Sequence, residues 1–347
     1  MNSKDIKRQL RLSPLASSEL YHLFRYYMKR DKMRGVMKKI GVDAAKERET
    51  AALMKRAMVK YRWDFDEYVM YHFAELTDTE RAAFVPEYEK NIFCDQVNDF
   101  HAARIFDSKW ESYVHFRDYY KRDCVRAENN KERQLFLKKH RDFILKPDSS
   151  ACGRGIKVIR TKDETDAVRQ VAMHLDKTLG VILEELIEND SIMASLHPQS
   201  LNTVRIPTVR YDDRVEVIHP FLRMGCGDAV VDNAGSGGIM GNVDAETGTV
   251  YAAADELGRG FTHHPDTGIE LIGFTIPRWQ EAVELVKEMA LVLPAVRYVG
   301  WDMALTTKGW VMIEGNDKGQ FVFQVADRNG FREEFEKIRK ELLECVQ

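Results

Sequence analysis

Apolar positions change their period along this chain, and the change predicts two kinds of structure. In residues 1–100 apolar side chains recur at helical spacing, as at Met33, Val36, Met37 and Ile40, with polar connections between the segments. From about residue 141, short apolar runs bounded by Gly, Pro, Asp and Asn are typical of strands: FILKP, GIKVIR, GVILEEL, TVRIPTVR and VEVIHPFLRM. We therefore predict a helical N-terminal region followed by an α+β unit.

Three later segments return to helical spacing. TKDETDAVRQVAMHL (161–175) lies between two predicted strands, and Thr161 or Asp163 is a plausible N-cap. RWQEAVELVKEMALVLP (278–294) predicts an amphipathic helix that Pro294 ends. The last segment predicts another helix, whose apolar stripe is Phe331, Phe335, Ile338 and Leu342.

The stretch VGWDMALTTKGWVMIEGN (299–316) places charged side chains on strands that otherwise resemble buried core. A three-residue loop, 307–309, would end in a glycine at a left-handed position and pair residue 306 with 310. Asp302 would then lie opposite Glu314, and Asn316 would share their face because strand side chains alternate.

Two opposed carboxylates destabilise a sheet unless a cation separates them. Carboxylate and amide oxygens suit Mg²⁺, so we interpret Asp302, Glu314 and Asn316 as metal ligands. The alternative is a salt-bridged pair, for which Lys308 and Lys318 are the nearby cations, although both are expected at solvent-facing turns.

The glycine-rich segment KPDSSACGRGIKV (146–158) runs into a predicted strand. A dinucleotide fingerprint or a Walker loop would instead run into a helix, so neither fits. A strand–loop–strand hairpin remains, whose backbone N–H groups could cover phosphates while Lys146 supplies a point charge. An ordinary glycine turn is the alternative.

Two adjacent carboxylates, Glu184 and Glu185, end the run GVILEEL. They mark either a strand end that reaches solvent or a hinge whose backbone pairs with a purine ring.

Composition adds the cellular setting. The chain has 347 residues, 44% apolar and 31% charged, which is ordinary for a globular protein of about two domains. Five scattered cysteines without a CxxC pair argue against a disulfide framework or a zinc site. With no signal-peptide pattern and no run of about 18 apolar residues, we expect a cytoplasmic protein without a transmembrane segment.

The charge is unevenly distributed. Residues 1–62 contain 17 Lys/Arg against 6 Asp/Glu, although the whole chain carries a net charge of −3. This segment is either a set of solvated helices with one core-facing stripe or a face that contacts an anionic partner, such as a membrane surface or a charged glycan. No nucleic-acid partner is expected, because no recognised binding fold accompanies the charge.

Taken together, these motifs resemble the ATP-grasp superfamily. The wording of SLNTVRIPTVR (200–210), VDNAGSGGIMGNVD (231–244) and VGWDMALTTKGWVMIEGN (299–316) is similar to its sugar-transfer-associated branch, which in turn resembles α-L-glutamate ligase-like and tubulin–tyrosine ligase-like enzymes. The resemblance covers roughly residues 100–325, and the order of the motifs carries it. It implies an ATP-grasp fold, in which two α+β subdomains clasp ATP.

The resemblance also implies a nucleotide site. Lys146, and Lys109 in FDSKW, correspond to lysines that contact ATP phosphates. The mobile phosphate loop corresponds to Ser149, Ser150, Gly153 and Gly155, and the adenine hinge to Glu184, Glu185 and Ile187.

By the same resemblance, Asp302, Glu314 and Asn316 correspond to ligands of two Mg²⁺ ions, with Glu314 bridging them. Arg205 and Arg223 correspond to catalytic basic residues that face the transferred phosphate or the acceptor. The acyl acceptor would lie beside the segment that holds Asn233, Gly237 and Gly238.

The domain expectation follows from these positions. Residues 1–100 form the basic helical region, and residues 101–347 form the ATP-grasp domain, with subdomains at 101–190 and 191–347. Many related enzymes begin with a Rossmann-like domain, but no βαβ pattern precedes residue 100 here, so their substrate rules are not transferred.

The implied activity is an ATP- and Mg²⁺-dependent ligase that joins a carboxylate to an amine through an acyl phosphate. The branch suggests small-molecule or sugar-linked substrates and polysaccharide biosynthesis. Two alternatives stay open: an ATP-grasp kinase acting on a sugar or polyol hydroxyl, and a non-catalytic ATP-binding module that recruits a partner.

Overall fold

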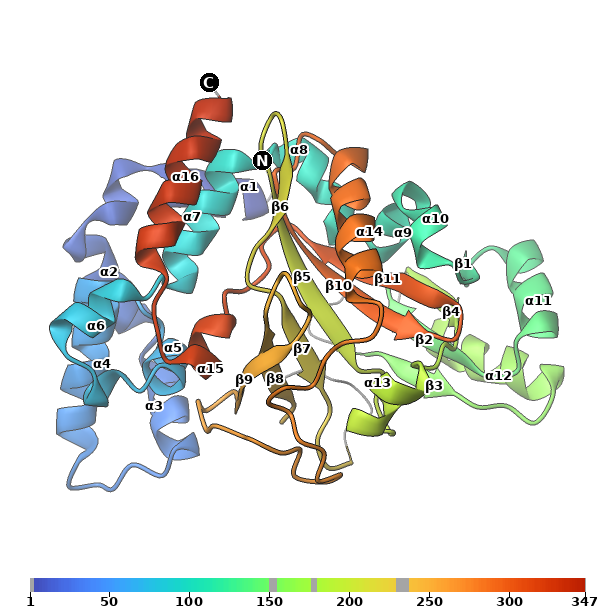
Figure 1. Cartoon of the computed structure of the whole chain (residues 1–347), viewed down its shortest axis with the longest axis horizontal. Coiled ribbons are helices and arrows are strands. Elements are labelled where there is room, and N and C mark those ends of the chain that lie inside the picture. Colours follow the sequence, from blue (N-terminus) through green and yellow to red (C-terminus); the bar gives the residue numbers. More distant parts are fainter. Residues whose placement is uncertain (1–2, 150–154, 176–179, 229–236, 347) are drawn as a thin grey trace.

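The computed structural model describes residues 3–149, 155–175, 180–228 and 237–346. Helices α1 to α7 form the left part of Figure 1, and two antiparallel sheets occupy its centre and right. Residues 1–2 lie outside the described part of the chain. Residues 3–100 contain no strand, as the sequence predicts. Their helices are α1 (Ser3–Leu12), η1 (Pro14–Ser17), α2 (Glu19–Met28), α3 (Arg30–Lys39), α4 (Glu47–Tyr61), α5 (Phe65–Met70), η2 (Phe73–Glu75), α6 (Asp78–Ala83) and α7 (Glu87–Val97).

Short helices connect this region to the smaller sheet: α8 (Phe100–Ala103), η3 (Arg104–Asp107), α9 (Lys109–His115) and α10 (Arg117–Tyr120). The smaller sheet has the order β1-β4-β2-β3 within the described residues. Its strands are β1 (Cys124–Arg126), β2 (Phe143–Pro147), β3 (Lys157–Ile159) and β4 (Val181–Glu185), accompanied by α11 (Asn130–Lys139) and α12 (Glu164–Leu175). The predicted glycine-rich hairpin is therefore β2–β3, with Leu145 paired to Lys157.

The larger sheet has the order β11-β10-β5-β7-β8-β9, with β6 paired to β5. Its strands are β5 (Thr203–Arg210), β6 (Val215–Val217), β7 (Phe221–Met224), β8 (Ile239–Val243), β9 (Val250–Asp255), β10 (Tyr298–Thr306) and β11 (Gly309–Asn316). The remaining helices are α13 (Ser191–Leu196), α14 (Trp279–Val292), α15 (Phe323–Asp327) and α16 (Arg332–Val346).

The two faces of the larger sheet have different neighbours. Val204, Ile206 and Trp301 belong to a core that includes the buried face of α14. Val209 and Tyr298, on the opposite face, join a second core with the N-terminal helices and α16. Further along that second face the side chains become polar, so this face carries both apolar packing residues and the charged residues described below.

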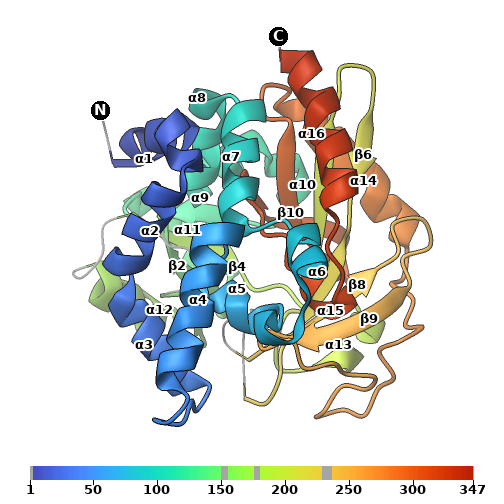
Figure 2. The ribbon, with the colours of Figure 1, turned by 90° about the vertical axis from the view of Figure 1, so that its left-hand side faces the viewer.

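The helix predictions are confirmed in their essentials. Asp163 caps α12, because its carboxylate accepts the backbone N–H of Asp166 at 2.8 Å. The predicted stripe of the last helix, Phe331 to Leu342, is buried. Figure 2 shows α16 beside α7, so the C-terminal helix shares a core with the N-terminal region.

The predicted hairpin loop is wrong by one residue. The turn between β10 and β11 pairs Thr306 with Gly309, which leaves two loop residues rather than three. Gly309 has φ +90°, a backbone conformation that favours glycine. A register shift then leaves Ile313 without a partner and pairs Asp302 with Glu314, as predicted.

None of the described helices is long and apolar enough to cross a membrane.

Candidate active site

A closed ion-pair network lies on the smaller sheet. Glu184 on β4 is only 2% exposed, and its carboxylate contacts Lys146 Nζ at 2.6 Å and the Arg122 guanidinium at 2.9 Å. Arg122 also donates to the backbone carbonyls of Tyr120, at 3.2 Å, and Met312, at 2.6 Å. Because Met312 belongs to β11, Arg122 ties the smaller sheet to the larger one.

The position of Lys109 is fixed by an N-cap and by the glycine-rich hairpin. The Ser108 hydroxyl accepts the Glu111 N–H at 3.1 Å, which caps α9, and donates to the Asp148 carboxylate at 2.9 Å. Asp148 follows β2 directly, and its carboxylate also accepts the Trp110 N–H at 3.0 Å. One aspartate thus holds the start of α9 against the end of β2, which brings Lys109 toward Lys146.

On the larger sheet, Asp302 is held by two arginines. Arg205 on β5 and Arg223 on β7 share a face with Asp302, because Asp302 pairs with Arg205 and Arg223 pairs with Thr203, two residues before Arg205. Arg205 donates to both oxygens of Asp302, and Arg223 Nη1 lies 3.0 Å from Oδ2. A salt bridge does exist here, but its cations are Arg205 and Arg223 rather than Lys308 or Lys318.

Glu314, in contrast, is loosely paired. Its nearest described cation is Lys109, at 3.9 Å, and its side chain is 37% exposed. Two residues on, the amide nitrogen of Asn316 is buried and has no hydrogen-bond partner among the described residues. Glu314 and Asn316 therefore have binding capacity that the described residues do not use.

The pKa shifts follow these contacts. Burial raises the pKa of Glu314, and Asp302 adds to the rise while Lys109 opposes it. Burial would also raise the pKa of Asp302, but Arg205 and Arg223 lower it below its ordinary value. The pKa of Glu184 falls in the same way, because Lys146 and Arg122 outweigh its burial.

Burial lowers the pKa of Lys109, and Lys146 lowers it further, while Glu314 opposes the shift. Lys109 therefore interacts electrostatically with the Glu184 network and with Glu314 of the larger sheet. The two groups form one site at the junction of the sheets.

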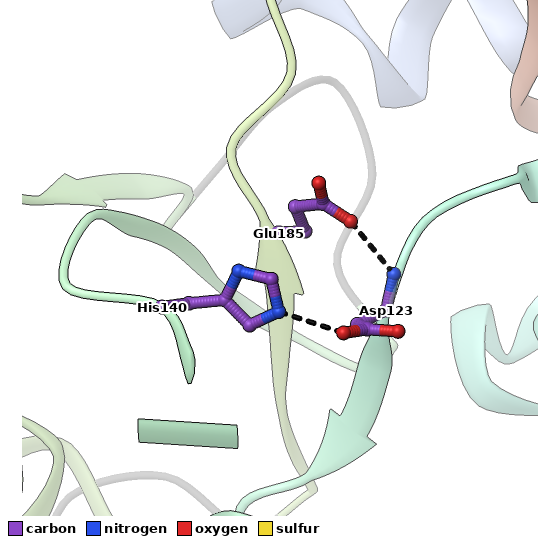
Figure 3. Close-up of side chains that lie close together, drawn as sticks. All are labelled: Asp123, His140 and Glu185. Atoms are coloured by element: carbon purple, nitrogen blue, oxygen red, sulfur yellow. Dashed lines mark hydrogen bonds and ion pairs between the residues drawn. The ribbon is translucent and has the colours of Figure 1, made fainter. Parts of the chain in front are cut away.

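The second hinge carboxylate, Glu185, belongs to a surface cluster. Figure 3 shows Glu185 accepting the Asp123 N–H, at 3.1 Å, while Asp123 contacts His140 Nε2 at 2.7 Å. The three side chains offer ligand atoms within 4.8 Å of one another. However, Lys139 also contacts Asp123 and Lys308 contacts Glu185. Two ammonium groups balance the two carboxylates, so we interpret the cluster as ion pairs.

The remaining predicted residues are placed as follows. Ser149 is exposed just after β2, and Ile187 is half-buried two residues after β4. Gly155 has φ +78°, and a Cβ there would lie 2.9 Å from Pro147, so the position requires glycine. Gly237 is exposed and Gly238 buried, just before β8. Ser150, Gly153 and Asn233 lie outside the described residues.

Two site residues escaped the sequence reasoning. Arg122 lies in YYKRDC among other charged residues, and no spacing rule distinguishes it. Asp148 follows the Lys-Pro pair of the glycine-rich segment, where an acid before Ser149 is a usual sign of a turn.

The family model described as sugar-transfer associated ATP-grasp matches residues 111–340. No curated protein matches the sequence.

Among solved structures, the chain is similar to D-alanyl-alanine synthetase A from Vibrio cholerae O1 biovar eltor, with 10% identity, a TM-score of 0.46, and coverage of 71% of this chain and 68% of that one. The ATP-grasp ligase PsnB, complexed with its minimal precursor, Mg and ADP, gives 14% identity, a TM-score of 0.43, and coverage of 81% and 75%. The ADP complex of N5-carboxyaminoimidazole ribonucleotide synthetase gives 12% identity and a TM-score of 0.40, with 62% of this chain covered. This chain spans only 46% of the length of that enzyme.

The family match covers well over half of the chain and includes both sheets, with Lys146, Glu184 and Glu314, whereas Lys109 lies just before it. This protein therefore belongs to the sugar-transfer associated ATP-grasp family.

Proposed function

We propose that the protein is an ATP- and Mg²⁺-dependent ligase that joins a carboxylate to an amine through an acyl phosphate. The observation that carries the proposal is the junction of the two sheets, where Lys109 and Lys146 approach the weakly paired Glu314. Among the described side chains at this junction, none is arranged as a covalent nucleophile with a base, and phosphoryl transfer needs none, because positioning and charge neutralisation supply most of its catalysis.

The residues of the larger sheet fit magnesium. Glu314 and Asn316 supply hard oxygen donors, and the unpartnered amide of Asn316 can present its oxygen after a flip, since amide O and N are assigned only from their partners. Asp302 already accepts three contacts from the arginines, but a carboxylate has about four acceptor positions. We propose that Glu314, together with Asn316 and Asp302, would hold two such ions. Bound magnesium would neutralise charge on the phosphates.

The chain's own cations would act on the reacting groups. The substrate carboxylate attacks the γ-phosphorus of ATP, which gives the acyl phosphate and ADP. An amine then attacks the acyl carbon and releases phosphate. Lys109 and Lys146 would neutralise the phosphate oxygens, while Arg205 and Arg223, which also hold Asp302, would face the transferred phosphate or the acceptor.

The nucleotide would lie over the smaller sheet. We propose that the glycine-rich hairpin, including Ser149, Ser150, Gly153 and Gly155, covers its phosphates. The segment of Glu185 and Ile187 would meet the adenine, and Glu184 would orient Lys146. The acceptor would lie beside Asn233, Gly237 and Gly238.

We propose domain limits at 1–100, 101–190 and 191–347. In support, the smaller sheet lies within residues 124–185 and the larger within 203–316. We also propose a sugar-linked substrate in polysaccharide biosynthesis, and a cytoplasmic location because Cys94, Cys124, Cys226 and Cys345 are free thiols.

Hydroxylamine trapping tests the reaction class. The purified protein is given Mg²⁺-ATP and a panel of amino acids, uronic acids and amino sugars. Hydroxamate formed in step with ADP supports carboxylate activation. ADP with a stable phosphorylated product and no hydroxamate would replace the ligase with a sugar or polyol kinase. ATP binding without any turnover would favour a recruitment module.

We also propose that the basic helical region contacts an anionic lipid surface. Leu20, Phe24, Tyr27 and Met28 lie on one face of α2 and are 52–71% exposed. Lys55 lies 5.9 Å from the Tyr27 ring. Self-association through this face would bring two basic regions together, whereas acidic lipid complements both the apolar stripe and the charge.

Vesicle sedimentation tests this contact. We expect the protein to sediment with phosphatidylglycerol-containing vesicles but not with pure phosphatidylcholine, and Phe24→Glu to abolish sedimentation. Leu135→Glu, at an exposed position of α11, is the control. Sedimentation unaffected by Phe24→Glu, or concentration-dependent dimerisation without vesicle binding, would overturn the contact.

A further inference from the structure

A basic groove lies beside the candidate active site, between α1, α7, the α8–η3 turn and the segment that follows β11. It consists of two cavities, of about 230 and about 340 Å³, which share Lys7, Arg11 and Asn91 in their walls. Figure 2 shows α1, α7 and α8 grouped together, and α1 packs on α7. Such volumes suit a molecule of about the size of a sugar.

The walls of the smaller cavity are predominantly basic. Five of its lining side chains are cationic and two are acidic; the cations are Lys4, Lys7, Arg11, Arg104 and Lys318. Among the described residues, Lys7 and Arg104 have no acidic partner, whereas Arg11 and Lys318 are engaged by the buried Asp95. Two cations are thus available to a ligand.

The acidic members of the wall weaken this charge little. Asp107 is engaged by Lys4. Asp317 lies beside Lys318 in the same wall. The larger cavity is mixed in charge, because Asp64, Glu67 and Glu87 lie in its wall together with Lys7, Arg11, Arg25 and Lys29.

The groove adjoins the reacting groups. Asp317 follows Asn316 directly, and Asp107 lies two residues before Lys109. Because consecutive Cα atoms are about 3.8 Å apart, the cavity wall begins within about 8 Å of both residues along the chain. The wall of the smaller cavity is thus close along the chain to two residues of the candidate site.

We propose that this groove binds an anionic group of the ligase substrate, a phosphate or carboxylate of a sugar-sized molecule, at a distance from the reacting carboxylate. Lys7 and Arg104 are the residues that bind it. That the bound molecule is the substrate of a ligase rests on the proposed function. Binding energy from such a remote group would position the reacting carboxylate.

Calorimetric titration tests the groove without requiring turnover. The protein is first saturated with Mg²⁺ and a non-hydrolysable ATP analogue, so that the positions of all three nucleotide phosphates are filled. Glucose 1-phosphate then probes phosphate recognition, glucuronate probes carboxylate recognition, and glucose is the neutral control. We expect at least one anion to bind and glucose not to bind.

The double variant Lys7→Glu, Arg104→Glu should weaken anion binding at least tenfold. Lys131→Glu, Lys138→Glu makes the same change in net charge at exposed positions of α11 and should alter binding less than twofold. Equal melting temperatures with the nucleotide analogue show that both variants fold.

Three results would overturn the groove: no binding of either anion, equal binding of glucose, or equal losses in the two double variants. The outcome is separable from that of the proposed function. Hydroxamate formation with no anion binding would reject the groove alone. Anion binding without hydroxamate formation in the trapping assay would reject the ligase chemistry and leave the groove as a binding site.

Discussion

Glu184 and Glu314 are both carboxylates near the end of a strand, yet their surroundings are opposite. Glu184 is enclosed by Lys146 and Arg122, and these cations lower its pKa. Glu314 has one distant cation, and burial together with Asp302 raises its pKa. The first carboxylate is satisfied by the chain, and the second keeps its capacity for a ligand. The difference separates a side chain that positions others from one that binds.

The largest expected effect concerns the satisfied carboxylate. Arg122→Met leaves Glu184 short of one cation and removes a donor from each of two buried carbonyls. Breaking a buried ion pair in this way costs about 3–5 kcal/mol of unfolding free energy. Urea denaturation measures the loss. Arg126→Met, nearby on β1 and paired only at the surface, is the control and should cost about 0.2–1 kcal/mol. Equal losses of unfolding free energy would show that the buried network stabilises the fold no more than a surface ion pair does.

The next effect concerns the open carboxylate. Glu314→Ala should lower turnover about 10²–10³-fold, comparable to the loss of one charge-stabilising donor, while the melting temperature stays the same or rises. ADP release in saturating Mg²⁺ measures it. Near-normal turnover would remove Glu314 from the site.

A smaller effect links Glu314 to pH. Its raised pKa means that the folded state resists ionisation of this group, so it lowers stability as pH rises from the ordinary carboxyl value, about 4.3, through the folded value. The melting temperature of Glu314→Gln should therefore equal that of the wild type at low pH and exceed it at neutral pH.

Melting curves recorded between acidic and neutral pH, without Mg²⁺, test this prediction. A constant difference between the two proteins at every pH would contradict the linkage. Asp302 and Glu184, whose pKa values are lowered, contribute stability that is lost only as pH falls below the ordinary carboxyl range.

The smallest effect concerns the surface contact between the sheets. Lys308→Ala removes the partner of Glu185, and because Lys308 is 46% exposed, the cost should be about 0.2–1 kcal/mol. Chemical denaturation measures it. A cost as large as that of Arg122→Met would show that Lys308, rather than Arg122, holds the sheets together.

Local periodicity predicted most of the fold. The runs FILKP and TVRIPTVR coincide with β2 and β5, because each is bounded by residues that break regular structure. The opposition of Asp302 and Glu314 was also predicted, although through a three-residue loop. The structure reaches the same pairing through a two-residue turn and an extra residue at Ile313. A bulge has no clear signature in the sequence, so the pairing of Asp302 with Glu314 could be predicted but the bulge could not.

The contacts of the site were less accessible. Pairing of Asp302 with Arg205 depends on β10 lying beside β5, which are about a hundred residues apart in sequence. Arg122 reaches Glu184 and Met312, which are 62 and 190 residues away in sequence. Such partners follow from sheet order, which one sequence without its relatives does not reveal.

The most direct test of the open carboxylate is Mn²⁺ binding, followed by electron paramagnetic resonance with Mn²⁺ in place of Mg²⁺ and ADP present. We predict that Glu314→Gln weakens Mn²⁺ binding at least tenfold, whereas Glu284→Gln, at an exposed position of α14, leaves it within twofold. Equal Mn²⁺ affinity in the wild type and Glu314→Gln would contradict the central claim that Glu314 is the ligand the fold keeps available.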